Sequence, residues 1–139
     1  MKVQEIMSRN VETVEPSTLT AKAAEKMRDL HIGFLVVLEN DHLEGVLTDR
    51  DITIRSVAEG RDPRASRVGD IMTPTVFYCY EEDDVERVGE QMREKEVRRM
   101  VILDEQDKLV GVVSLGDIAK TIGETDLAGE TLGDIAEAA

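Results

Sequence analysis

The sequence of 139 residues has few aromatic residues and almost no cysteine: two Phe, two Tyr, no Trp and one Cys. A single cysteine excludes an internal disulfide framework and suits a reducing compartment. With so few aromatic side chains, the core has to be built from aliphatic residues in thin layers. A Gly-rich phosphate loop of the P-loop or dinucleotide-binding type is also missing.

Long hydrophobic runs are absent as well. No stretch approaches the ~20 apolar residues of a membrane-spanning helix, and the first residues lack the apolar segment of a secretion signal. The formal net charge of −13 disfavours a broad surface for nucleic acid or anionic membranes, because both are bound chiefly by Lys and Arg. We therefore expect a cytoplasmic protein with neither nucleic acid nor membrane as a partner.

What the sequence does contain is an internal repeat. Residues 45–52, GVLTDRDI, return as residues 111–118, GVVSLGDI, and Ile6-Met7 returns as Ile71-Met72. The offset is 65 residues at first and 66 later, because a surface turn accepts one extra residue. The expected divisions are repeat one at 1–60, a linker at 61–69, repeat two at 70–123, and a tail at 124–139 with a short helix over 131–138.

Each repeat reads as strand, helix, strand, strand, helix. Apolar residues at helical spacing predict a helix over 19–30, and the acidic run 81–84 suits the start of the matching helix. Short apolar runs joined by polar turns predict two hairpins. Their strands span 35–38 with 43–47, and 100–103 with 109–113. We expect an α/β fold of the α+β type, in which two β-α-β-β-α units pack about a pseudo-twofold axis, since ~60 residues bury too little surface alone.

A tandem pair in this order resembles a pair of CBS domains, or Bateman module. Each unit opens on Ile-Met and closes on Gly, two hydrophobic residues, Thr or Ser, two further residues and Asp-Ile. The likeness covers residues 3–122 and is greatest to small stand-alone CBS-pair proteins of bacteria and archaea. It implies a non-catalytic regulatory module, such as an energy sensor, that binds AMP, ADP, ATP or S-adenosylmethionine in clefts between the repeats. A homodimer and a regulated partner protein are implied too.

The resemblance also implies which residues bind the ligand. By the family pattern, Asp51 and Asp117 hold the ribose hydroxyls, while Thr48 and Ser114 face phosphate. Arginine is well shaped for phosphate, and three arginines are near these positions: Arg50, Arg98 and Arg99. The adenine is expected near two segments, made of Ile32, Gly33 and Phe34 in repeat one and of Val97, Arg98 and Arg99 in repeat two.

Two departures from the pattern affect these expectations. Family members often have Pro where this chain has Val36 and Val101, so the cleft wall differs in both repeats. Repeat two has Gly116 where repeat one has Arg50, so the two sites are not expected to bind alike.

The same spacing also fits a simpler role. Thr48 and Asp51, like Ser114 and Asp117, stand three residues apart at the start of a predicted helix, where a capping box would use them to satisfy backbone N–H groups. Both roles are compatible if the cap yields to the ligand. A ligand-free protein-interaction scaffold is therefore the first alternative function.

Other chemistry has less support from the residues. His31, His42 and Cys79 lack the paired spacing of zinc ligands, so no metal site is expected. No enzyme is expected either, although carboxylates can act as acid and base, which leaves weak nucleotide hydrolysis as a second alternative. Four other arginines fit a solvated surface: Arg55, Arg61, Arg64 and Arg67.

Overall fold

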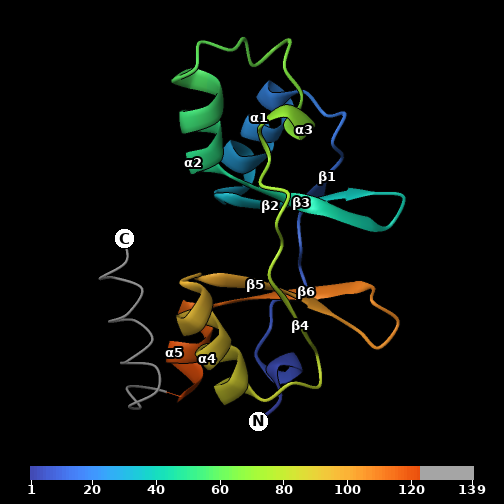
Figure 1. The fold of residues 1–139 in the computed structure, drawn as a ribbon, viewed down its shortest axis with the longest axis vertical. Coiled ribbons are helices and arrows are strands. Elements are labelled where there is room, and N and C mark those ends of the chain that lie inside the picture. Colours follow the sequence, from blue (N-terminus) through green and yellow to red (C-terminus); the bar gives the residue numbers. More distant parts are fainter. Residues whose placement is uncertain (123–139) are drawn as a thin grey trace. The chain divides into compact units, whose positions relative to one another are not determined.

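The computed structural model describes residues 1–122, so the helix expected at 131–138 lies outside the described part. It contains two three-stranded sheets with their helices (Figure 1). Contacts divide the chain into two compact units. The repeat-one unit is residues 11–76, and the repeat-two unit is residues 1–10 together with the chain from Phe77 onward. Within residues 1–122, no helix has the length and apolar character needed to cross a membrane.

The repeat-one unit has the sheet order β1-β2-β3, with β1 parallel to β2 and β2 antiparallel to β3. A short α-helix runs directly into a π-helix after β3. In chain order the elements are β1 (Thr13–Val14), α1 (Thr20–Leu30), β2 (Phe34–Glu39), β3 (His42–Thr48), α2 (Asp49–Asp51), the π-helix η2 (Ile52–Val57) and α3 (Val68–Ile71).

The repeat-two unit has the equivalent order β4-β5-β6, with the same parallel and antiparallel pairings. Its elements are the 3-10 helix η1 (Val3–Glu5), β4 (Tyr78–Tyr80), α4 (Val85–Lys95), β5 (Arg99–Leu103), β6 (Leu109–Ser114) and α5 (Leu115–Ile122). The predicted α+β class and the five-element order of each repeat are confirmed. Helix α1 and the hairpin strands lie within one residue of their predicted bounds, and α4 begins directly after the acidic run 81–84.

Each unit has its own aliphatic core on the helix-covered side of its sheet. In repeat one, Ala23 and Met27 of α1 pack with Leu35 and Leu47 of the sheet. In repeat two, Val88 and Met92 of α4 occupy the matching places. Burying one such aliphatic side chain stabilises a fold by about 1.5–3 kcal/mol. These layers therefore fix the sheets on which the candidate site is built.

Each unit is completed by a segment from outside its own repeat. Val46 of β3 and Thr73 exchange backbone hydrogen bonds of 2.9 and 2.8 Å, and Ser8 exchanges bonds of 2.9 and 3.0 Å with Val112 of β6. A glycine precedes the paired residue in each strand, Gly45 before Val46 and Gly111 before Val112, and its lack of a side chain lets the outside segment come close. A Cβ on Gly45 would lie 2.6 Å from the Thr73 carbonyl oxygen, a distance that no side chain tolerates.

The same outside segments satisfy the first N–H groups of the long helices. In α1, the N–H of Thr20 donates to the Ser66 carbonyl at 2.9 Å, and the N–H of Ala21 donates to the Pro63 carbonyl at 2.8 Å. In α4, the N–H of Val85 donates to the Met1 carbonyl at 2.9 Å. Asp84 is the N-cap residue of α4, yet its side chain makes no capping bond. Backbone carbonyls therefore accept these N–H groups in place of the usual capping side chains.

Candidate functional site

The strand-to-helix junction of each repeat forms a complete capping box. In repeat one, Thr48 Oγ1 accepts from the Asp51 N–H at 3.1 Å, and Asp51 Oδ2 accepts from the Thr48 N–H at 3.0 Å. In repeat two, Ser114 Oγ and Asp117 Oδ2 do the same at 3.1 and 2.8 Å. The helix-capping role is thus present at both junctions.

Backbone pairing brings the segment before β2 or β5 to the junction of its own repeat. Phe34 is paired with Thr48 across the β2–β3 hairpin, and Arg99 is paired with Ser114 across the β5–β6 hairpin. The first residue of each following helix is hydrogen-bonded to the same segment. The N–H of Asp49 donates to the Gly33 carbonyl at 3.1 Å, and the equivalent N–H of Leu115 donates to the Arg98 carbonyl at 2.8 Å.

The eleven predicted ligand-binding residues therefore form two groups, one around each junction. The arginines of the set are exposed, and the other members are half-buried. The repeat-one group is Ile32, Gly33, Phe34, Thr48, Arg50 and Asp51, and the repeat-two group is Val97, Arg98, Arg99, Ser114 and Asp117. Their role in binding a ligand stays a prediction.

Arg55 and Thr73 belong to the repeat-one junction although the sequence did not single them out for it. Arg55 Nη1 donates to the Ile71 carbonyl and to Thr73 Oγ1, both at 3.0 Å, and lies 3.7 Å from Asp51 Oδ1. Thr73 Oγ1 in turn donates to Asp51 Oδ2 at 3.4 Å. Arg55 is 44% exposed, but it is a tethered side chain and not the purely solvated one expected. Its spacing of four residues from Asp51 on a helix was the available signal.

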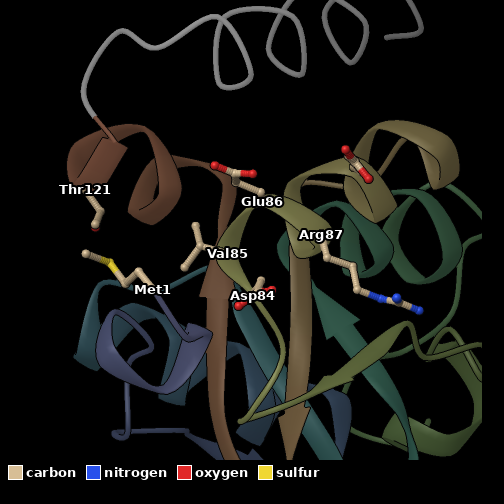
Figure 2. A pocket seen from close by; sticks show the side chains of 7 residues that line it. Met1, Asp84, Val85, Glu86, Arg87 and Thr121 are labelled. Atoms are coloured by element: carbon tan, nitrogen blue, oxygen red, sulfur yellow. The ribbon is translucent and has the colours of Figure 1, made fainter.

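Two surface hollows lie within single units and away from the junctions. Figure 2 shows one of about 670 Å³ at the start of α4, where Met1, Val85 and Thr121 lie beside Asp84 and Glu86. The other, of about 640 Å³, lies between β1 and the β2–β3 turn and has two lysines of α1 in its lining. None of the eleven predicted residues lines either hollow. The first is lined by the carboxylates of Asp84, Glu86 and Glu90 and by one arginine, Arg87, and this excess of negative charge disfavours an anionic ligand.

The described residues include few groups that are placed to bind a metal ion or to act as a nucleophile. Across residues 1–122, no three His, Cys, Asp or Glu side chains gather as metal ligands would. Cys79 is buried in the repeat-two core. Burial raises the pKa of its thiol to about 12, with a smaller contribution from Asp83. The thiol is therefore protonated at neutral pH and is a poor nucleophile or ligand.

The fold and the paired junctions define a class: a tandem α+β module with one hydroxyl–aspartate junction in each repeat. The CBS domain family model matches residues 3–57 and 68–124. The chain belongs to the CBS domain family, and as a CBS pair it is a regulatory module.

Known proteins share this architecture over nearly the whole chain. The CBS domain-containing protein YhcV of Bacillus subtilis is 35% identical over 133 residues, which are 96% of this chain and 94% of that protein. A conserved CBS domain protein of unknown function from Thermoplasma acidophilum aligns with a TM-score of 0.84 and 25% identity, over 99% of this chain and 75% of that one. The cytosolic domain of the Mg²⁺ channel MgtE, solved with ATP, aligns with a TM-score of 0.74 and 25% identity, over 86% of this chain and 48% of that one.

Proposed function

We propose that this CBS pair is a non-catalytic sensor that binds AMP, ADP, ATP or S-adenosylmethionine at one or both junctions. The observation that carries the proposal is the placement of a half-buried carboxylate, Asp51 or Asp117, at a helix start beside the segment that leads into the hairpin. A carboxylate can accept both hydroxyls of a ribose, while a helix start and nearby arginines favour phosphate. The MgtE domain solved with ATP supports this ligand class.

The bound ligand acts by changing the affinity of the module for a partner protein. A ligand shifts the balance of two states only by binding one of them more tightly than the other, and the partner must distinguish the same two states. A homodimer is part of the proposal. Two apolar side chains of η2, Ile54 and Val57, are 44% and 66% exposed, and this exposed apolar surface is the part of the chain that we assign to contact with a second copy. Light scattering of the wild type and of Val57→Glu tests this surface.

Calorimetric titration with each of the four ligands tests the binding. Saturable binding is expected in the wild type and is lost in Asp51→Ala, in Asp117→Ala or in both. A parallel series with Asp51→Asn and Asp117→Asn keeps an oxygen for the cap and removes the charge. Incubation of the protein with ATP and separation of the products is the control for hydrolysis, and unchanged ATP is expected. Failure of all four ligands to bind or to raise the melting temperature would contradict the proposal.

A ligand-free scaffold is the second candidate, because both capping boxes are complete without any ligand. It predicts that each Asp→Ala change costs about 1 kcal/mol of folding free energy through loss of the cap, and that no ligand effect exists to be lost. Chemical denaturation alongside the titrations separates the two functions.

A further inference from the structure

The two junction aspartates have the same cap but different surroundings. Each uses Oδ2 to accept the N–H of its cap residue, at 3.0 Å in Asp51 and 2.8 Å in Asp117. Each then has Oδ1 left over. What faces that second oxygen decides whether a diol can reach the carboxylate.

In repeat one, both oxygens of Asp51 have further partners. Oδ1 lies 3.7 Å from Arg55 Nη1, and Oδ2 accepts from Thr73 Oγ1 at 3.4 Å. Arg55 is itself fixed, because the same nitrogen donates at 3.0 Å to both the Ile71 carbonyl and Thr73 Oγ1. The Asp51 side chain is only 13% exposed. A diol that is to bind here has to displace a guanidinium that is hydrogen-bonded elsewhere.

In repeat two, the residues at these positions are different. The repeat offset places Thr121 where repeat one has Arg55, and Ser8 where it has Thr73. Thr121 Oγ1 donates to the backbone carbonyl of Asp117 at 2.9 Å and not to the carboxylate, and Figure 2 shows its side chain at the hollow beside Met1. In the part of the chain that the structure describes, Asp117 Oδ1 has neither an ion-pair partner nor a hydrogen-bond donor.

The charged residues beside the two junctions also differ, and this difference again favours repeat two as the binding site. Arg98, which is exposed, takes the place of Gly33, and Leu115 takes the place of Asp49. In repeat one, a Cβ built on Gly33 would lie 2.9 Å from Asp49 Oδ2, so a carboxylate stands against this stretch of backbone. Repeat one also has Arg50, where repeat two has Gly116, but the neighbouring Asp49 offsets that charge. In repeat two, Leu115 stands in the place of Asp49, so the charge of Arg98 is not offset there and an anionic phosphate is favoured more at repeat two.

We infer that a phosphorylated ribose binds preferentially at the repeat-two junction, where Asp117 and Arg98 lie. Arg55 is a positioning residue, which holds the Asp51 carboxylate in its present contacts and so keeps a ligand out of the repeat-one junction. This inference rests on the proposed function for the identity of the ligand. The contact between Arg55 and Asp51 stands apart from it and can be measured without ligand.

Titration with AMP and with ATP tests the assignment of the site. The wild type is expected to bind one nucleotide per chain, Asp51→Asn to keep that binding, and Asp117→Asn to weaken it at least tenfold. Arg55→Thr, which copies the repeat-two residue, is expected to add a second binding event, whereas Arg55→Lys keeps the wild-type stoichiometry. Loss of binding in Asp51→Asn with retention in Asp117→Asn would overturn the inference, as would weaker binding in Arg55→Thr.

A double-mutant cycle without ligand tests the Arg55–Asp51 contact itself. Melting temperatures of Arg55→Thr, Asp51→Asn and the double variant are expected to be non-additive, the second change costing less once the first is present. Additive changes would overturn the positioning role. If the wild type binds no adenosine ligand, the proposed function and the site assignment both fail. Binding at the repeat-one junction instead leaves the function intact and refutes only the inference.

Discussion

Val46 and Thr73 exchange both backbone hydrogen bonds, so a segment that follows the linker acts as an extra partner for the edge of β3. Ser8 and Val112 form the same pair on β6. The residues that open each repeat in the sequence therefore pair with the sheet of the other repeat, within one compact unit in each case. Edge strands without such a partner expose unpaired backbone groups, so these two pairs protect one edge of each sheet.

Gly45→Ala is expected to destabilise the protein by about 2 kcal/mol, because the added Cβ would lie 2.6 Å from the Thr73 carbonyl and push that segment off β3. Gly116→Ala is the matched control. Its Cβ meets only Ser114 Oγ, at 3.5 Å, so this change is expected to be neutral or stabilising. Urea denaturation measures both variants. Equal losses would show that the contact with Thr73 is not the cause.

Glu96→Gly is expected to stabilise the protein by about 1 kcal/mol. Glu96 ends α4 with a φ of 55°, a left-handed conformation that glycine adopts without steric cost. Glu94→Gly, at an exposed position inside the same helix, should lose about 1 kcal/mol instead. A loss in both variants, measured by thermal and urea unfolding, would contradict this account of the helix end.

Ser56→Ala is expected to raise stability by about 1 kcal/mol. Ser56 is fully buried in η2, and its Oγ has no hydrogen-bond partner among residues 1–122, so the hydroxyl carries a desolvation cost without a compensating bond. The contrasting variant is Thr20→Val. That buried hydroxyl lies 3.1 Å from Ser66 Oγ, and its removal should destabilise. If both changes destabilise, Ser56 has a partner that this structure does not hold, such as a buried water.

Cys79 is expected to resist a thiol reagent in the native protein at pH 8 and to react at once in denaturant, because burial holds the pKa of the thiol at about 12. The pKa difference also sets the sign of a pH effect on stability. Below the ordinary pKa of 9.0 both states are protonated, so the full stabilisation is present. Between pH 9 and about pH 12 the unfolded chain loses the proton first, so stability falls as the pH rises. Cys79→Ala should lose that part of the alkaline dependence.

Much of the fold was predictable because it is encoded locally. Apolar spacing marks α1 and α4, and the short apolar runs mark the two hairpins, so the bounds of α1 and of the hairpin strands follow from the sequence. The cap pairs Thr48–Asp51 and Ser114–Asp117 were predicted from a spacing of three residues. The short helices η1 and α3 were not, since one turn carries no period.

The features that were missed depend on contacts between distant residues. The pairing of Val46 with Thr73 uses backbone atoms alone, so no pattern of side chains in the sequence predicts it. The π-helix at Ile52–Val57 is visible only through its wider hydrogen bonds, such as the Ala58 N–H to the Thr53 carbonyl at 2.9 Å. Arg55 looked like one solvated arginine among several, because its partners at Ile71 and Thr73 lie well beyond the reach of helical spacing.

The exchange of outer segments also sets an order of events during protein synthesis. The repeat-one unit is continuous in the chain, so every residue that it needs has left the ribosome soon after Val76. The repeat-two unit needs residues 1–10, which emerge early, and Val112, which emerges late. Residues 1–10 therefore stay without their sheet partner until Val112 has been synthesised. In ribosome-bound chains halted before Val112, residues 1–10 should be sensitive to protease, and they should become protected once the chain extends past β6.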